Sequence, residues 1–320
     1  MANFLVTGGT GFVGSHLLNK LLQQDNKIWC LTRHQKEHLL KNKSIEWIEA
    51  DLLDKDTYKH ILTNIDYIFH IAGLISARKT EEYYRVNVEC TKELFEAVSN
   101  TTSSLKKIIY MSSIAAMGAN YNGKLLKESD PCSPSTEYGK SKLQAEHIAL
   151  HYSTSIPVLI LRPSLIYGRG DLNALNFLKA IFTQTNYFIY SNIKTISLCH
   201  VSDVVQSCLL STEKDIKSGE IFIISDPEIY TWQKIQNILI KTFNDLLPTH
   251  SLKEYISTFF FKLFSKSEIC SLKASHFQYW GCNINKARAL LGFEPKMSLR
   301  EGAYDTICWY IKEGLFNLKK

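Results

Sequence analysis

A glycine-rich loop lies between an apolar strand and an amphipathic helix at the start of the chain, and it restricts the fold more than any other feature. Residues 3–7 are mostly apolar, and residues 12–24 carry apolar side chains at helical spacing. Between them stands TGGTGFVG, with glycines at Gly8, Gly11 and Gly14. The three glycines allow a tight turn, close approach of backbone to a pyrophosphate, and close packing of helix on strand. The loop therefore predicts a dinucleotide-binding turn.

The start of the following helix strengthens this prediction. A helix N-terminus offers unpaired N–H groups and the positive end of the helix dipole to a phosphate. The residues that we expect to bind the dinucleotide at this turn are Gly8, Thr10, Gly11, Phe12, Val13 and Gly14.

Short apolar runs and amphipathic stretches alternate through the first half of the chain. We expect further strands at residues 27–32, 45–49, 66–72, 107–112 and 157–161, and helices at 81–99 and 138–152. Buried strands that alternate with helices predict an α/β fold with a parallel sheet covered on both faces. Right-handed crossovers then make this sheet doubly wound, as in a Rossmann fold.

Strands and helices alternate less regularly after residue 163, where we expect strands at 196–200 and 220–224 and a helix at 231–243. We assign residues 1–167 with 196–230 to the dinucleotide-binding domain. Residues 168–195 with 231–320 are assigned to a smaller, mostly C-terminal substrate-binding domain.

Composition indicates a soluble globular protein, with 45% hydrophobic and 21% charged residues. We find neither a signal peptide nor an apolar run long enough to span a membrane, so we expect a cytoplasmic protein without a transmembrane segment. Eight cysteines occur without a C-x-x-C pair, which favours buried thiols in a reducing compartment over a zinc site or a disulfide framework. We therefore expect no metal.

The net charge of +6 is concentrated in residues 251–300, which hold eight basic and three acidic side chains. No nucleic-acid motif accompanies them, so we expect no nucleic-acid partner. An anionic small molecule, an acidic carrier and a merely solvated face stay open as explanations. Residues 255–266 are apolar with spaced lysines; a buried helix is preferred there over contact with a hydrophobic substrate or a membrane surface.

The end of the second expected strand bears on the choice of cofactor. An acidic residue at this place usually holds the ribose 2′-OH of NAD. This chain has Thr32 and Arg33 there, about 18 residues beyond the last glycine of the loop. A guanidinium suits a 2′-phosphate, so NADP(H) is favoured over NAD(H) as the cofactor.

Three Y-x-x-x-K pairs are present, in which a lysine ammonium can lie beside a tyrosine phenol on one helical face. Such an ammonium favours the phenolate and brings its pKa toward neutrality. Tyr138 and Lys142 alone lie on a helix within the alternating series, shortly after a strand that ends in two serines. The pairs Tyr190/Lys194 and Tyr230/Lys234 lie beyond that series and are interpreted as structural.

Several segments in order resemble the extended short-chain dehydrogenases/reductases of the NAD-dependent epimerase/dehydratase superfamily. The segments are TGGTGFVG at 7–14, ADL at 50–52, HIAG at 70–73, RVNVECT at 85–91, YMSSIAAMG at 110–118, YGKSK at 138–142, LRPSLIYG at 161–168, HVSDV at 200–204 and NINKARALLGFEP at 283–295. The resemblance covers nearly the whole chain, and the combination is specific although each segment alone is not.

The resemblance implies a role for each matching residue. Ser113, preferred over Ser112, would donate a hydrogen bond to the substrate carbonyl, Tyr138 would be the acid/base, and Lys142 would bind the nicotinamide ribose. Further cofactor contacts would come from Asp51, Leu52, Ala72, Gly73, Asn87, Pro163 and Ser164. Asn87 has an equally good structural interpretation, as does His200. A homodimer is a family expectation.

Two departures from related enzymes narrow the expected activity. Sugar dehydratases of this superfamily have a threonine followed by an acidic pair where this chain has Ser113, Ile114 and Ala115, so a dehydratase is disfavoured. The Thr32-Arg33 pair resembles NADPH reductases similar to dihydroflavonol reductase. We therefore expect an NADPH-dependent carbonyl reductase acting on a small-molecule carbonyl. An NDP-sugar epimerase acting on a sugar substrate is the alternative, and a non-catalytic NADP(H)-binding sensor is the alternative of another class.

Overall fold

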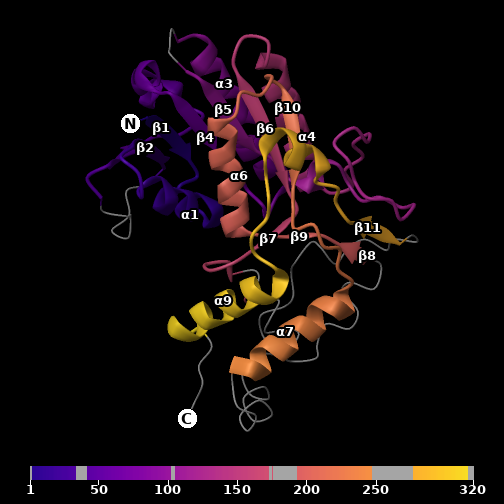
Figure 1. Ribbon diagram of the computed structural model, residues 1–320. Coiled ribbons are helices and arrows are strands. Elements are labelled where there is room, and N and C mark those ends of the chain that lie inside the picture. The colour runs from indigo at the N-terminus through magenta and orange to yellow at the C-terminus, as the bar shows by residue number, and fades with distance from the viewer. Residues whose placement is uncertain are drawn as a thin grey trace.

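A parallel sheet forms the centre of the molecule (Figure 1). The computed structural model describes residues 2–33, 42–101, 105–172, 175, 193–246 and 277–315. Within these residues the central sheet has the strand order β10-β6-β5-β4-β1-β2-β3, and every neighbouring pair is parallel. Its strands are β1 Asn3–Thr7, β2 Lys27–Thr32, β3 Ile45–Glu49, β4 Tyr67–His70, β5 Lys107–Met111, β6 Val158–Pro163 and β10 Glu220–Ile224.

Helices cover both faces of this sheet, which confirms the predicted doubly wound α/β fold. On one face lie α1 (Phe12–Leu21) and α6 (Val201–Glu213), and on the other lie α3 (Cys90–Ser99) and α4 (Glu137–Tyr152). Alternate side chains of a strand enter opposite cores because successive Cβ atoms point to opposite faces. In β1, for example, Val6 packs with α1 while Leu5 packs on the far side.

The strand order reverses direction at β1, which pairs with β2 on one side and with β4 on the other. The connections that leave β1 and β4 therefore diverge above their carboxyl ends. In open α/β sheets this divergence creates the crevice where ligands bind. The glycine loop that follows β1 stands at this point.

The helix predicted at residues 81–99 is divided into three parts. It consists of α2 (Thr80–Tyr84), a π-helical turn at Arg85–Glu89, and α3. A π turn accommodates one extra residue, and such turns are frequent at functional sites. Here Asn87 and Val88 of the turn are buried.

The C-terminal part adds small parallel pairings and a helical layer. The strand predicted at 196–200 divides at Ser197, because β8 pairs with β11 whereas β9 pairs with β7. In Figure 1, α7 and α9 lie together below the sheet, and they share a third apolar cluster with β8 and β9. The bounds are β7 Leu165–Tyr167, β8 Ile193–Ile196, β9 Leu198–His200, β11 Gln278–Trp280, α7 Trp232–Leu246 and α9 Leu299–Lys312. The division into two domains at the predicted boundaries stays a prediction.

Short helical turns complete the described secondary structure. The 3-10 turns are η1 Lys55–Thr57, η2 Lys59–Asn64 and η4 Ile114–Ala116, and a second π-helical turn is η6 Ala287–Leu291. Across the described ranges, every helix is too short or too polar to cross a membrane. The described cysteines are free thiols, of which Cys30, Cys90, Cys199, Cys208 and Cys282 are buried.

A buried lysine ties the sheet to the end of α6. Lys107, at the start of β5, is 8% exposed. Its Nζ donates hydrogen bonds to the carbonyl oxygens of Ser211 at 3.0 Å and Lys214 at 2.7 Å. The last carbonyls of a helix have no intrahelical partner and form the negative end of its dipole, so a cation there is stabilising.

We expect the substitution Lys107→Met to lower the free energy of unfolding by about 1–3 kcal/mol, because the terminal carbonyls of α6 lose charged donors. Urea denaturation followed by circular dichroism measures this loss. The neighbouring Lys106→Met is the control, since Lys106 pairs with Asp66 at the surface and should matter less. Equal losses in the two variants would contradict the proposed role of Lys107.

Candidate active site

The glycine loop packs so tightly that side chains cannot replace its hydrogens. A Cβ on Gly14 would lie 2.1 Å from the carbonyl oxygen of Gly8. Gly8 has a φ of +75°, and a Cβ there would lie 2.6 Å from the backbone nitrogen of Ala72. Because non-glycine residues disfavour positive φ and cannot tolerate such contacts, Gly8 and Gly14 are required by the fold of the loop. The loop also brings Ala72 beside Gly8.

The N-terminus of α1 is free to receive an anion. Gly11 is the N-cap of this helix and supplies no side-chain cap, and no acidic residue stands in the first turn. The first N–H groups therefore keep their hydrogen-bonding capacity and the dipole is not neutralised. This geometry fits a pyrophosphate held by the N–H groups of Phe12 and Val13, whereas the N–H of Gly11 donates to the carbonyl of Gly8 within the loop.

A buried polar chain, which sequence reasoning missed, joins β1 to β4 at the crevice. His70 Nδ1 lies 2.7 Å from Thr7 Oγ1, and His70 Nε2 lies 2.9 Å from Thr91 Oγ1. Thr91 donates to the carbonyl of Asn87, and Thr7 accepts from the backbone N–H of Ala72. Nε2 of the imidazole is therefore the donor and Nδ1 the acceptor. Burial, together with the nearby Lys142 charge, lowers the pKa of His70 to about 3, so this ring is neutral.

Asn87 is used to hold the loop that follows β4. Its Oδ1 accepts from the backbone N–H of Leu74 at 2.7 Å. Its Nδ2 donates to the carbonyl of Leu74 and to Ser141 Oγ of α4. These three bonds occupy both amide hydrogens, which favours the structural interpretation of Asn87. Its contact with cofactor stays a prediction.

Ser113 and Tyr138 meet at the carboxyl end of β5. Ser113 is the N-cap of η4, where its Oγ accepts from the N–H of Ala115 at 3.1 Å. Tyr138 lies in the first turn of α4 and is half-buried. Burial raises the pKa of the Tyr138 hydroxyl, a hydrogen bond with Ser113 opposes this rise, and the neighbouring Tyr83 adds to it. The Tyr83 and Tyr138 rings lie 6.2 Å apart between centroids.

Lys142 enters the same region one helical turn later and is 3% exposed. Its Nζ donates to the carbonyl oxygen of Met111 at 2.7 Å and lies 4.4 Å from the centre of the Tyr110 ring. A Cβ on Gly73 would lie 3.7 Å from this Nζ, so the loop after β4 also reaches the ammonium. Burial lowers the pKa of Lys142 to about 7, against the opposing charge of Glu146.

A buried ion pair behind Lys142 is a second feature that sequence reasoning missed. Arg162 donates from Nε to Glu146 Oε1 at 2.9 Å and from Nη2 to Oε2 at 2.6 Å. Both side chains are almost fully buried. Ser112 completes the group through a 2.5 Å hydrogen bond to Glu146, so Ser113 is the serine left to face the crevice. The sequence signal that could have indicated this group was the spacing of Lys142 and Glu146, which stand four residues apart on one helix.

Pro163 is the last residue of β6, and Ser164 follows it. The backbone N–H of Ser164 donates to Ile224 in β10. Its Oγ is buried without a hydrogen-bond partner. Because buried hydroxyls in native proteins are almost always paired, this oxygen fits a ligand group in the crevice.

Arg33 lies exposed just beyond β2, and the hydrogen bond from Ala50 to Thr32 brings the Asp51 segment alongside. Both charges act on the thiol of Cys90, whose pKa is raised to about 11: burial is the main cause, Asp51 adds to the rise, and Arg33 opposes it. Asp51 Oδ1 caps the N–H of Leu53 at 3.0 Å. The positions predicted for the adenosine part of the cofactor, Leu52 included, thus share one neighbourhood.

The other Y-x-x-x-K pairs do not join this group. Tyr230 donates to Asp226 at 2.5 Å, and Lys234 is paired with Glu228. Tyr190 lies outside the described residues, as do residues 255–266 and the lysines between 253 and 273. His200 is buried at the end of β9, and its Nδ1 lies 2.7 Å from Ser202 Oγ.

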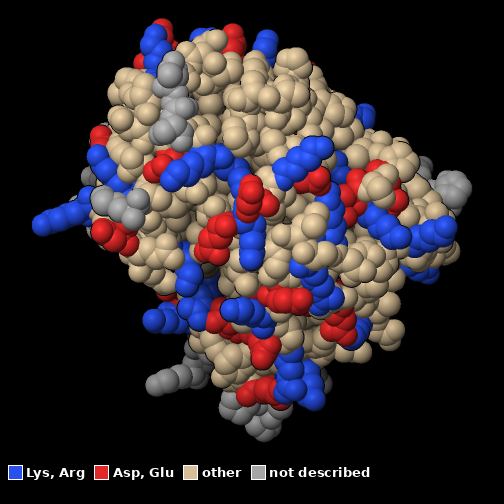
Figure 2. All heavy atoms as spheres, turned by 45° about the horizontal axis from the view of Figure 1, so that its top comes forward, with Lys and Arg blue, Asp and Glu red and all other residues tan. Residues whose placement is uncertain are grey.

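Charge at the described surface is mixed. Figure 2 shows basic and acidic side chains interspersed over the visible face, without a broad basic field. Three cations of the basic stretch 251–300 are paired with carboxylates: Lys286 with Glu220, Arg288 with Glu294, and Arg300 with Asp245. This pairing favours a solvated face for the described part of that stretch.

Comparison with known proteins identifies the family of this chain. The family model for the "NAD dependent epimerase/dehydratase family" matches residues 4–225, which is more than half of the chain. A 4-hydroxy-2-methyl-3-oxo-4-farnesyl-3,4-dihydroquinoline-1-oxide ketoreductase of Stigmatella aurantiaca is 26% identical over 74% of this chain and 72% of its own length. The UDP-glucose 4-epimerase of Vibrio cholerae is 26% identical over 95% of this chain and 94% of its own length.

Among solved structures, the UDP-glucuronic acid 4-epimerase of Bacillus cereus, in complex with UDP-glucuronic acid and NAD, superposes with a TM-score of 0.79. It is 23% identical, and the match covers 97% of this chain and 99% of that one. This likeness supports the fold. The matched family, the glycine loop at the strand crossover and the Ser113–Tyr138 contact agree, and the chain belongs to the NAD-dependent epimerase/dehydratase family of NAD(P)-dependent enzymes.

Proposed function

We propose that this enzyme is an NADPH-dependent carbonyl reductase that uses Ser113, Tyr138 and Lys142. The observation that carries the proposal is the meeting of the Ser113 and Tyr138 hydroxyl groups at the carboxyl end of β5, close enough for Ser113 to lower the pKa of Tyr138, where a substrate would meet the cofactor. When bound, the dinucleotide supplies the hydride for the carbonyl carbon. The protein supplies orientation, a proton and charge.

Ser113 and Tyr138 both present hydroxyl groups that can donate to one carbonyl oxygen. Because burial raises the pKa of Tyr138, this phenol keeps its proton at neutral pH until the oxygen gains negative charge. The proton then passes from Tyr138 to the forming alkoxide, and a proton from solvent replaces it. Lys142 favours the transient phenolate when its ammonium is charged.

The sequence after Ser113 disfavours elimination of water. Ile114 is buried and Ala115 carries no functional group, so these positions offer no acid and no base. A reductase needs neither. The printed function of the Stigmatella aurantiaca relative, a ketoreductase, is consistent with this choice.

The runner-up, an NDP-sugar epimerase, draws its support from the relative in Vibrio cholerae, which matches nearly the full chain.

The two candidates differ in stoichiometry. A reductase consumes one NADPH for each product, measured by absorbance at the nicotinamide band against a panel of ketones, whereas an epimerase shows no net consumption of dinucleotide. We expect Tyr138→Phe to lower kcat by roughly 100-fold or more, because the proton donor is lost. Tyr84→Phe is the matched control, since Tyr84 contacts Glu137 and is not expected to touch substrate. Product formation without dinucleotide consumption would reject the reductase.

The choice of NADPH is tested at Arg33. We expect Arg33→Ala to raise the Kd for NADPH at least about tenfold, the loss of one charge-assisted phosphate contact, and to leave the Kd for NADH unchanged. Fluorescence titration of the reduced dinucleotides measures both constants. Arg288→Ala, which removes a distant surface guanidinium, serves as control. An Arg33→Ala protein with unchanged preference would refute the assignment of NADP(H).

The buried Lys142 should cost stability in the protein without cofactor. A lysine whose pKa falls from 10.5 to about 7 on folding destabilises the fold fully below pH 7, and the penalty disappears as pH rises to 10.5. We therefore expect Lys142→Met to abolish reduction and to raise the free energy of unfolding below pH 7. Its advantage over the natural protein should fall by about 1.4 kcal/mol per pH unit between pH 7 and 10. Urea denaturation at pH 6, 8 and 9.5 measures it; a constant difference would show that Lys142 is not desolvated.

A further inference from the structure

The turn that follows β7 connects the cofactor helix to the C-terminal helix α9. Residues 168–171 form a turn in which the N–H of Asp171 donates to the carbonyl of Gly168 at 3.2 Å. Gly170 has a φ of +87°, the conformation that the third residue of a type II turn requires. The turn therefore has a defined conformation. It connects α1 with α9, and no other part of the proposed reaction links these two helices.

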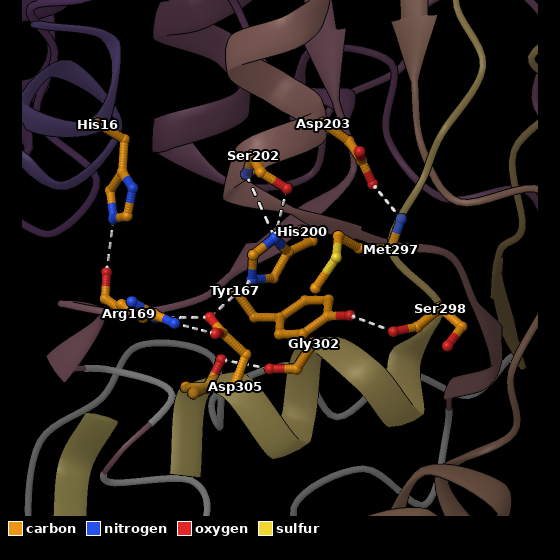
Figure 3. Close-up of polar contacts among 11 residues, drawn as sticks. His16, Tyr167, Arg169, His200, Ser202, Asp203, Met297, Ser298, Gly302 and Asp305 are labelled. Atoms are coloured by element: carbon orange, nitrogen blue, oxygen red, sulfur yellow. Dashed lines mark hydrogen bonds and ion pairs between the residues drawn. The ribbon is translucent and has the colours of Figure 1, made fainter. Parts of the chain in front are cut away.

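On one side the turn contacts α1. His16 Nε2 donates to the carbonyl oxygen of Arg169 at 2.7 Å, one turn beyond the start of the helix (Figure 3). A Cβ on Gly170 would lie 3.9 Å from the ring of Phe12. Phe12 is the first residue of α1, whose N–H groups are expected to bind the pyrophosphate. The turn thus lies directly against the phosphate-binding end of this helix.

On the other side the turn is held by α9. Arg169 contacts both carboxylate oxygens of Asp305, through Nε at 2.7 Å and through Nη2. Figure 3 shows this guanidinium directed from the turn toward the helix. Tyr310, further along α9, donates to the carbonyl oxygen of Asp171. The helix therefore holds two residues of the turn.

Asp305 also faces a donor that lacks a partner. His200 is 5% exposed and its Nδ1 accepts from the N–H of Ser202, so the ring proton is on Nε2. This Nε2 has no hydrogen-bond partner and lies 3.9 Å from Asp305 Oδ2. A small movement of the carboxylate would satisfy His200. Asp305 is therefore the acceptor that two side chains face: Arg169 from the turn and His200 from the end of β9.

Close packing restricts movement of α9 away from β7 and β9. A Cβ on Gly302 would lie 2.5 Å from Tyr167 Oη and 3.0 Å from His200 Cδ2, so the helix rests against β7 and β9 through a bare backbone position. Movement of the turn is thus easier than movement of the helix, because the side chain of Arg169 is 54% exposed and its ion pair can open into water.

We propose that the turn 168–171 is a latch over the phosphate end of the dinucleotide and that Arg169 and Asp305, as positioning residues, hold it closed. This inference rests on the cofactor site of the proposed function and is independent of the substrate. Release of the used dinucleotide then requires the Arg169–Asp305 pair to open. The strength with which Asp305 of α9 holds Arg169 therefore sets the rate of cofactor exchange.

Stopped-flow fluorescence of NADPH, chased with excess NADP⁺, measures this release without turnover. We expect Arg169→Ala and Asp305→Ala each to raise the dissociation rate constant at least about fivefold. The double variant should release NADPH no faster than either single variant, since both changes remove one interaction. Arg288→Ala with Glu294→Ala, an exposed ion pair elsewhere in the C-terminal part, should leave the rate constant unchanged.

Arg169→Lys distinguishes a latch from a general loss of packing. It keeps the charge but loses the two-pronged contact, so its rate constant should fall between those of the natural protein and Arg169→Ala. Natural release rates in a folded Asp305→Ala protein would overturn the latch, as would effects of the two single variants that add. If the rate constants change as expected but no ketone is reduced, the reductase proposal fails and the latch stands. If ketones are reduced but the release rate constants do not change, the reductase proposal stands and the latch fails.

Discussion

The approach of α1 to β1 is the contact on which the rest of the site depends. Gly14 lies against the carbonyl of Gly8, where no side chain could fit. This contact directs the start of the helix at the crossover of the sheet, so that its unpaired N–H groups face the crevice. The residues that contact the loop are in turn arranged around it: Ala72 from the segment that follows β4, Cys30 from β2, and the turn after β7 from the other side.

Polar side chains inside the crevice are fixed before any ligand binds. His70 is held at both ring nitrogens, Asn87 uses both of its amide hydrogens, and Glu146 receives three hydrogen bonds. Such groups need no reorganisation when charge develops in a reaction. Lys142 is the exception, because its ammonium is buried against a carbonyl and an aromatic ring and remains only partly charged at neutral pH. Burial of Lys142 thus lowers the free energy of unfolding at the residue that the proposed reaction uses.

The sequence predicted the central sheet well because the inner strands β2, β5 and β6 are buried on both faces and are mostly apolar, and because the edge strand β3 combines apolar and charged residues. The bounds of β1, β2 and β3 agree with the prediction, and the glycine loop defined the crevice. The short strands β7, β8 and β11 have three or four residues each, too few to show a period. The network of His70 and the Glu146–Arg162 pair were not predicted either, since their partners are brought together only by the tertiary fold.

The π turn at Arg85–Glu89 makes the length of this segment a structural requirement. Removing one residue would convert the turn to regular α-helix, while α2 and α3 would keep their relative orientation because the π turn holds the extra residue within one widened turn. Leu94 and Phe95 would then stay in the core, but the widened turn that places Asn87 beside Leu74 would be lost. The extra residue therefore serves the wall of the crevice and not the packing of α3, because deleting it would remove the support that Asn87 gives to the loop after β4 while the helices that cover the sheet stay in place.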